Sequence, residues 1–282
     1  MKIAHLILCH AYPDQLKRLI GRLQHADAHF YIHLDKKTEI MEFQPLSELP
    51  NVYFIKNRVN VHWAGYSQVQ STINGFKEIL ESGITYDYTN LLSGQDYPVK
   101  SIEDIHDFLA ANPGKAFMHT LSVYHEWQEA IPRLTKYYLA DNAFPGKNTI
   151  ERMMNSLLPK RRMPEKMEPV GRSTWFTVSA GCVQYIIDYL QENPSFARFF
   201  KMSWGADEIF FQTILYNSVF KNDMVNDNLR YIDWSAGGAN PKLLTMADAV
   251  ALKNSDKLFA RKFNAAIDDK ILDYLDSLAS AR

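Results

Sequence analysis

The sequence has few cysteines and lacks the common signatures of nucleotide and zinc enzymes. Its two cysteines, Cys9 and Cys182, are far apart and form no C-x-x-C pair. We therefore expect two buried free thiols rather than a disulfide framework or a zinc knuckle. The Walker loop, the GxGxxG loop, the GxSxG elbow and the HExxH motif are also missing. Their absence weighs against P-loop, dinucleotide-dependent, α/β-hydrolase and zinc-peptidase chemistry.

Neither an excess of charge nor a long apolar run is present. The 282 residues contain 31 Lys and Arg against 32 Asp and Glu, which gives a net charge of −1. No global field therefore favours nucleic acid or an anionic membrane. No window approaches the roughly 18 to 20 apolar residues of a membrane span, and the apolar run in MKIAHLILCHAY is short for a signal peptide. We expect a cytoplasmic protein with no nucleic-acid partner.

The basic cluster Lys160-Arg161-Arg162 leaves two interpretations open. It lies in residues 142–168, which we interpret as an irregular excursion with one short helix, so the simpler interpretation is a solvated loop. The alternative is a contact with an anionic acceptor or with lipid headgroups. That contact would place the protein peripherally at the inner face of a membrane.

Strand and helix patterns alternate over the first 110 residues. Apolar and β-branched runs predict strands at 2–8, 29–34, 52–55 and 86–92. Amphipathic spacing predicts helices at 14–23, 68–82 and 102–111. Such alternation predicts an α/β fold with a mostly parallel central sheet flanked by helices. With no repeat and no clear linker, we expect a single domain over 1–282.

The second part of the chain has a less regular pattern. Strands are predicted at 117–122, 175–179 and 229–234. Helices are predicted at 183–192, 207–216, 248–253, 257–263 and 268–278.

The stretch Asn90–Ser101 joins a predicted strand to a predicted helix through a polar loop. Gly94 can bend freely, Pro98 bars a continuing central strand, and Ser101 with Asp104 has the spacing of a helix start. In an open α/β sheet this order presents ligand-binding groups beyond the carboxyl end of a strand. A plain strand-to-helix connection explains the spacing equally well. The polar side chains in question are Ser93, Gln95 and Asp96.

Candidate catalytic carboxylates occur without a D-x-D pair, the usual means of holding a divalent cation on a nucleotide-sugar diphosphate. Asp207 and Glu208 follow Trp204 and precede an apolar helix. Favourable interaction with the helix dipole is a sufficient explanation for both acids. The functional alternative is that Glu208, desolvated beside aromatic residues, has a raised pKa and takes a proton from a sugar hydroxyl.

Without a metal, a bound diphosphate needs protein cations. Lys242 follows a flexible loop, and Arg261 with Lys262 lies in the block LFARKF. Lysine is a compact charge that suits phosphate oxygens. The alternative is that Arg261 and Lys262 are ordinary exposed helix cations.

Several blocks of the sequence resemble one family. They are IAHLILCHAYPDQLKRL, YIHLDKK, VHWAGYSQVQ, NLLSGQDYPVKS, WGADEIFFQTIL, RYIDWS and LFARKF. In this order they resemble the core-2/I-branching β-1,6-N-acetylglucosaminyltransferases, a family that includes peptide O-xylosyltransferases. The blocks cover about residues 3–263. The compact length without an anchor resembles a bacterial member.

The resemblance implies a GT-A-like fold, a UDP-sugar donor, metal-independent transfer and inversion at the anomeric carbon. The family's catalytic base is the glutamate of an S-P-D-E block, which corresponds to Glu208, with Gly205 and Ala206 replacing the serine and the proline. The diphosphate-binding lysine corresponds to Lys262. A second family cation, an arginine, has Lys242 as its nearest match, which is a departure from the pattern.

Further site residues follow from the same resemblance. The uridine-contacting acid corresponds to Asp35 and a residue in the loop beside the base to His10. Trp234 matches an acceptor-side aromatic, while Glu126 and Arg133 fall roughly where the family has acceptor contacts. Trp63, Ser93, Gln95 and Asp96 are expected to bind substrate, and Arg261 to assist Lys262. Residues 1–115 would form the nucleotide-binding half and 116–282 the acceptor and catalytic half.

The resulting hypothesis is a transferase that moves a sugar, N-acetylglucosamine or xylose, to a hydroxyl of a glycan or glycolipid acceptor, as in polysaccharide biosynthesis. Two other possibilities remain open. A nucleotide-sugar hydrolase or a different transferase would use a similar sheet. A non-catalytic protein that binds carbohydrate or nucleotide-sugar would keep the fold without needing Glu208.

Overall fold

The computed structural model describes residues 1–280. Its strands are β1 (Ile3–Cys9), β2 (Ala28–Leu34), β3 (Val52–Phe54), β4 (Tyr88–Ser93), β5 (Asp96–Pro98), β6 (Ala116–Phe117), β7 (Leu121–Ser122), β8 (Val170–Gly171), β9 (Phe176–Ser179), β10 (Met224–Val225), β11 (Arg230–Ile232) and β12 (Phe259–Arg261). Its α-helices are α1 (Pro13–Arg22), α2 (Tyr66–Glu81), α3 (Ile102–Ala110), α4 (Ile131–Thr135), α5 (Lys147–Leu157), α6 (Ala180–Glu192), α7 (Pro194–Phe200), α8 (Phe210–Tyr216), α9 (Ala249–Lys253) and α10 (Lys270–Ser280). Shorter 3₁₀ segments are η1 (Met41–Glu48), η2 (Gln128–Ala130), η3 (Pro164–Lys166), η4 (Ala206–Glu208), η5 (Val219–Asp223) and η6 (Met246–Asp248).

The main sheet has the strand order β10-β6-β9-β4-β1-β2-β3. The neighbours β4, β1, β2 and β3 are parallel, whereas β9 is antiparallel to both β4 and β6. The α/β class and the mostly parallel sheet predicted from the sequence are therefore confirmed. The division into halves at residue 115 stays a prediction.

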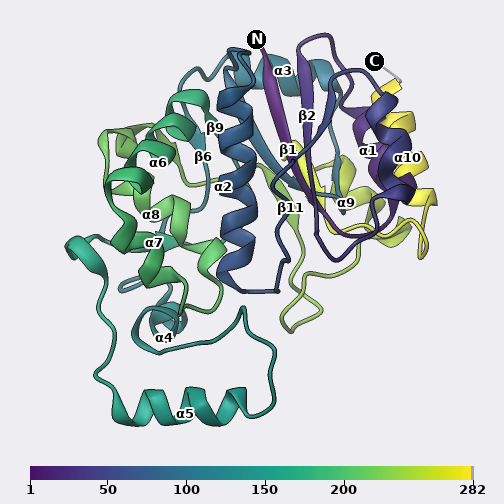
Figure 1. Ribbon diagram of the computed structural model, residues 1–282. Helices are drawn as coiled ribbons and strands as arrows, with labels where there is room; N and C mark the ends of the chain where they lie inside the picture. Colours follow the sequence, from purple (N-terminus) through teal and green to yellow (C-terminus); the bar gives the residue numbers. More distant parts are fainter. Residues whose placement is uncertain (281–282) are drawn as a thin grey trace.

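Helices cover both faces of this sheet (Figure 1). Strand β1 shows the alternation: Ala4 and Leu6 belong to the core that includes α2, α6 and α8, while Ile3 and Ile7 belong to the core that includes α1, α3 and α10. A strand buried on both faces has no solvent-exposed polar side, which explains why the sequence of β1 is apolar apart from the buried His5. Both cysteines are buried and unpaired, as predicted.

The parallel strands end at one edge of the sheet. Leu8 lies opposite Ser93 in the β1–β4 register, and Cys9 lies opposite Leu34 in the β1–β2 register. A Cβ on Gly94 would lie 2.9 Å from the Cβ of Cys9. Gly94 therefore serves a close approach of two strand ends rather than a free bend.

Two sequence predictions near this edge are wrong. Residues 257–263 are not a helix but contain β12, which lies between β11 and β5 in a small second sheet. A short apolar run does not distinguish a strand from a helix. Here the segment is a strand because it pairs with β11 on one side and β5 on the other. The polar loop after Ser93 contains β5, in which Pro98 is tolerated because β5 is an edge strand.

The basic cluster 160–162 is not uniformly solvated. Arg161 is buried and donates hydrogen bonds to the carbonyl oxygens of Lys136 (2.9 Å), Met202 (2.5 Å) and Phe199. Lys160 and Arg162 on either side are exposed. The simple loop interpretation fails for Arg161, because free carbonyls of neighbouring segments supply partners for the buried guanidinium.

Candidate active site

A cavity of about 1140 Å³ opens beyond the carboxyl ends of β1, β2 and β4. Most of the predicted site residues line it. They are His10, Asp35, Trp63, Ser93, Gln95, Arg133, Glu208, Trp234, Arg261 and Lys262. Segments far apart in the sequence thus converge where parallel strands end, the usual position of ligand sites in open α/β sheets.

Glu208 lies at the end of η4 and forms an ion pair with Arg133 through its Oε2. Its side chain is 28% exposed, so it can meet a ligand from the cavity. The main chain is fixed as well, because Arg172 N donates to the Glu208 carbonyl oxygen at 2.9 Å. The glutamate is therefore held by a cation, in contrast to the predicted purely aromatic surroundings.

The Arg133 guanidinium lies between two tryptophan rings. Its Cζ is 4.7 Å from the Trp127 centroid and 4.6 Å from the Trp204 centroid. Stacking on both faces leaves the planar edge of the guanidinium for the carboxylate. Gly205 adjoins this arrangement in the left-handed region (φ 65°), and a Cβ there would lie 2.7 Å from Arg133 Nη1. Glycine meets both requirements.

The neighbouring acid, Asp207, has the perturbed environment that the sequence had suggested for Glu208. It is buried, and its Oδ2 accepts a hydrogen bond from Thr174 Oγ1 at 2.5 Å. Burial, and then the charge of Glu208, raises the pKa of Asp207 to about 6. The side chains of these two adjacent acids therefore differ in access: Glu208 meets the cavity more openly than Asp207 does.

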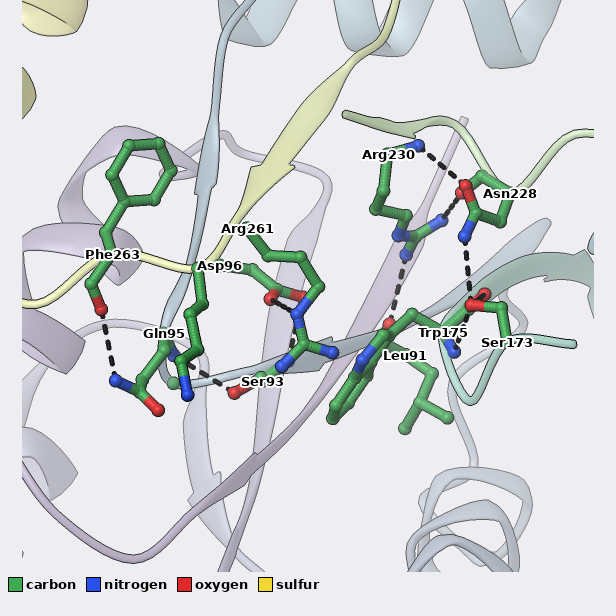
Figure 2. Close-up of polar contacts among 12 residues, drawn as sticks. Leu91, Ser93, Gln95, Asp96, Ser173, Trp175, Asn228, Arg230, Arg261 and Phe263 are labelled. Atoms are coloured by element: carbon green, nitrogen blue, oxygen red, sulfur yellow. Dashed lines mark hydrogen bonds and ion pairs between the residues drawn. The ribbon is translucent and has the colours of Figure 1, made fainter. Parts of the chain in front are cut away.

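Asp96 was predicted to bind substrate directly, but it is fully buried in β5 and does not line the cavity. Its Oδ1 is 3.3 Å from Nε of Arg261, and its Oδ2 accepts from Ser93 N at 3.0 Å. Arg261 in turn lies over Trp175, with Cζ 4.3 Å from the ring centroid (Figure 2). Asp96 therefore positions Arg261 and Ser93 instead of touching a ligand.

Arg230, which the sequence did not indicate as a site residue, is buried and forms several hydrogen bonds to neighbouring strands. It donates to the Leu91 carbonyl oxygen at 3.0 Å and to Asn228 (Figure 2). It also donates to the Phe176 carbonyl oxygen at 3.1 Å and to the side chain of Asn90. These bonds join β4, β9 and β11. A single arginine in an apolar strand pattern gave no sequence signal of this role.

Two lysines predicted for a diphosphate have different surroundings. Lys262 lines the cavity, and burial followed by the neighbouring Arg261 lowers its pKa. Lys242 does not line the cavity, and its Nζ is 2.6 Å from Asp248 Oδ1 and 3.7 Å from Asp233 Oδ2. The prediction for Lys242 is therefore revised, because two carboxylates already neutralise it.

Gln95 connects the Asn90–Ser101 stretch to the segment that carries Lys262. Its Nε2 donates to the Phe263 carbonyl at 3.1 Å, and Phe263 N donates to the Gln95 carbonyl at 2.9 Å (Figure 2). Beside it, Asp35 is buried at the end of β2, where its Oδ1 accepts from Lys37 N at 2.9 Å. The sheet edge thus holds these polar groups in fixed positions.

Aromatic side chains form the outer part of the cavity. Trp63 and Trp204 make an edge-to-face pair with centroids 5.5 Å apart, and Trp63 and Trp234 are 61% and 53% exposed. Exposed indoles at a cavity mouth suit stacking on apolar faces of a ligand. Sequence reasoning missed Trp127, Trp175 and Trp204 as cavity residues, although Trp204 was noted as a neighbour of Glu208.

Glu126 lies outside the cavity. It is exposed, does not line the cavity, and its Oε2 accepts from Ser122 N at 2.9 Å. The sequence blocks around it aligned poorly with the family, which explains the wrong placement. Within residues 1–280, no group of three or more His, Cys, Asp or Glu side chains is arranged to hold a metal ion.

The comparisons with known proteins decide the family. A family model described as "Branch: Core-2/I-Branching enzyme" matches residues 3–256. The chain belongs to this Core-2/I-branching enzyme family. The resemblance that the sequence blocks indicated is therefore confirmed, while a bacterial origin stays a prediction.

Relatives of this family member include animal xylosyltransferases. Xylosyltransferase 2 of Rattus norvegicus is 27% identical over 308 residues, covering 98% of this chain and 33% of that protein. A xylosyltransferase of Ciona intestinalis is 22% identical over 302 residues, covering 98% and 34%. The chain thus spans about a third of the length of the curated relatives it matches.

Solved structures that resemble the fold include a galactosyltransferase, LgtC, in complex with donor and acceptor sugar analogues. Its TM-score is 0.44 at 9% identity, with 98% of this chain and 95% of that chain covered. Mouse xyloside xylosyltransferase 1 has a TM-score of 0.41 at 10% identity, covering 92% and 97%.

Proposed function

We propose that this family member is an inverting glycosyltransferase that moves a sugar from a UDP-sugar to a hydroxyl of a glycan or glycolipid acceptor. The observation that carries the proposal is a single cavity containing an accessible, ion-paired carboxylate and, on a different segment, a lysine in partly buried surroundings. Family membership and the names of the relatives favour N-acetylglucosamine or xylose as the sugar.

The proposed chemistry is a single displacement. Glu208 takes the proton of the acceptor hydroxyl, whose oxygen forms a bond to the anomeric carbon as the bond to UDP breaks. Arg133 keeps the carboxylate oriented through Oε2, so that we assign Oε1 to the acceptor. Preorganisation by the two tryptophans lowers the cost of placing the base.

Lys262 is the proposed partner of the diphosphate. An ammonium in partly buried surroundings stabilises charge that develops on the leaving phosphate more strongly than a fully solvated one. Arg261, fixed by Asp96 and Trp175, adds positive potential beside it. Asp35 and His10, at the ends of β2 and β1, are the proposed nucleoside contacts, and transfer without a metal is part of the proposal.

The test is a donor screen that measures UDP release from a panel of UDP-sugars by the purified protein, with simple glycosides as acceptors. We expect release that depends on one donor and on acceptor, and that continues in excess EDTA. Strict dependence on Mn²⁺ would contradict the role given to Lys262. Release without acceptor stimulation would favour a hydrolase.

A non-catalytic carbohydrate-binding protein is the second candidate, favoured by the exposed Trp63 and Trp234. The two functions differ in their need for the nucleotide. Thermal stabilisation by UDP that disappears in Lys262→Ala supports the transferase. Stabilisation by glycans alone, with no response to UDP, supports the binding protein.

A further inference from the structure

Helix α5 stands apart from the body of the molecule. It is the outermost element in Figure 1, carried by the segment between α4 and β8. We call residues 139–166 the α5 arm. None of the residues of α5 is buried. The chemistry proposed for the cavity does not involve this helix, so its exposed side chains need a separate explanation.

Two polar side chains of α5 contact the chain just before the helix, at residues 137 and 139. Glu151 Oε1 accepts from Leu139 N at 2.7 Å, and Asn155 bonds to both Tyr137 N and Tyr137 O at 2.8 Å. Glu151 and Asn155 are four residues apart and so share one side of the helix. The other polar residues of the helix, among them Arg152 and Ser156, are exposed.

Apolar side chains of α5 are exposed as well. Ile150, Met153 and Leu157 have the i, i+3, i+7 spacing of one helix face and are 43%, 56% and 76% exposed. Leu158 and Phe144, at the two ends of the helix, are 45% and 41% exposed. We call these five exposed side chains the apolar strip of an element that has no buried residue. Such a strip indicates a binding surface.

The same arm carries several cations. The exposed or half-exposed ones are Lys147, Arg152, Lys160, Arg162 and Lys166. The three acids of the arm are Asp141, Glu151 and Glu165, and they accept hydrogen bonds from Ser67 N, Leu139 N and the Tyr189 hydroxyl, respectively. The unengaged charge of the arm is therefore positive, although the whole chain carries a net charge of −1.

Arg161 fastens the arm to the body. Its guanidinium donates to carbonyl oxygens of the segments at residues 136 and 202 and lies 4.1 Å from the Phe199 ring centroid. Lys160 and Arg162 are exposed on either side of this buried anchor. The arm is thereby held in a fixed orientation with its apolar strip and exposed cations available.

We propose that the α5 arm binds the surface of an anionic lipid membrane, with the apolar strip in the headgroup and acyl boundary and the cations on phosphate groups. An amphipathic helix with basic residues beside an apolar face has the composition of an interfacial helix. At 11 residues it is about 16 Å long, so it lies on the membrane and does not cross it. No helix within residues 1–280 is long and apolar enough to span a bilayer.

A second copy of the chain fits this surface less well. A two-fold contact would bring identical patches together and so oppose the same cations on both copies. An anionic lipid surface instead supplies the complementary charge. The arm also adjoins the mouth of the candidate active site, because Trp63 lines both the main cavity and a smaller one beside Phe144 and Lys147. Membrane binding would therefore present this mouth to the lipid surface.

The test is flotation of the full-length protein with vesicles of phosphatidylcholine alone or mixed with phosphatidylglycerol. We expect binding to the anionic vesicles that weakens as salt is raised. Met153→Ser/Leu157→Ser should reduce the apparent affinity about tenfold or more, because two exposed apolar side chains are lost from the contact. Lys160→Glu/Arg162→Glu should abolish the preference for phosphatidylglycerol.

The matched control is Val219→Ser/Val250→Ser, which removes two side chains that are 81% and 71% exposed elsewhere. It should bind vesicles as the unchanged protein does. Equal binding by the apolar-strip variant and this control would overturn the proposal, as would no binding of the unchanged protein to anionic vesicles. Lipid-free dimerisation lost only in the strip variant would assign the strip to a second copy. Thermal stabilisation by UDP should be the same in all these variants.

Discussion

Two arginine–carboxylate pairs contribute side chains to the same cavity and differ in the access of their acids. In Arg133–Glu208 the acid is 28% exposed, whereas in Arg261–Asp96 it is fully buried. Each guanidinium is stacked on tryptophan, so the arginines are comparably fixed. The difference indicates that the first pair presents a carboxylate for chemistry, while the second holds an arginine in place.

Removing the base of the exposed pair should have the largest effect. Glu208→Gln keeps the shape of the side chain but cannot take a proton, so we expect turnover to fall about 10² to 10⁴-fold. The measurement is UDP release with the donor found in the screen. Glu126→Gln is the control, since Glu126 does not line the cavity. Near-normal turnover in Glu208→Gln would remove Glu208 from the mechanism.

Removing the acid of the buried Arg261–Asp96 pair should lower the stability of the fold. Asp96→Ala leaves Arg261 without its partner, so we expect the free energy of unfolding to fall by about 3 to 5 kcal/mol. Urea denaturation measures this loss, and Glu126→Ala should change it by less than about 0.5 kcal/mol. Unchanged stability with slower transfer would show that Asp96 acts on substrate after all.

The two lysines extend the comparison to the diphosphate. Lys262→Ala should weaken UDP binding about tenfold, in line with the loss of one charge-assisted hydrogen bond. Lys242→Ala should change UDP affinity about twofold at most, because that ammonium pairs with Asp248 and Asp233. Isothermal titration with UDP measures both. Equal losses in the two variants would show that both lysines reach the nucleotide.

The smallest expected effect concerns Asp207. Its folded pKa is raised to about 6 by burial and then by Glu208, above the unfolded value near 3.9. The folded state therefore binds the proton more tightly, and the charged form costs stability as pH rises through 6. Asp207→Asn should increase the free energy of unfolding by on the order of 1 kcal/mol at pH 7.5.

The pH dependence supplies the control for Asp207→Asn. At about pH 2.5, well below the unfolded pKa of Asp207, both states of the unchanged protein carry the neutral acid, so the two proteins should unfold with nearly equal free energy. Denaturant titrations at both pH values measure the difference. A stability gain that persists at low pH would mean that the amide acts through packing rather than through charge.

The sequence predicted the parts of the fold that depend on local pattern. The runs that became β1, β2 and β4 are rich in apolar and aromatic residues over six or seven positions. Ser101 does cap α3, because its side chain accepts a hydrogen bond from Asp104 N at 3.1 Å. Strand β12 was missed because its three residues are stabilised by pairing with distant strands. That information does not lie within any short window of the sequence.

The sequence predicted correctly those cavity residues whose position follows from a family block. It failed for residues whose side chains are engaged by ion pairs with distant segments. Glu208 and Lys262 line the cavity, as the family blocks suggested. Asp96 and Lys242 occur in similar blocks, yet each is engaged by a counter-charge from another segment. Residue type and spacing gave no sign of these ion pairs, because their partners are brought together only by tertiary packing.

The residue at position 205 and the position of the Arg133 side chain depend on each other. The family block has serine and proline where this chain has Gly205 and Ala206, so grafting S-P-D-E into the chain would be a natural step in protein engineering. A serine at position 205 would adopt a left-handed backbone at a cost of about 1 to 2 kcal/mol and would meet Arg133 at close range. The guanidinium of Arg133 would have to shift to admit the Cβ at position 205, and this shift would disturb the ion pair that holds Glu208. An exchange of this loop between two proteins should therefore take Gly205, Arg133 and Glu208 together.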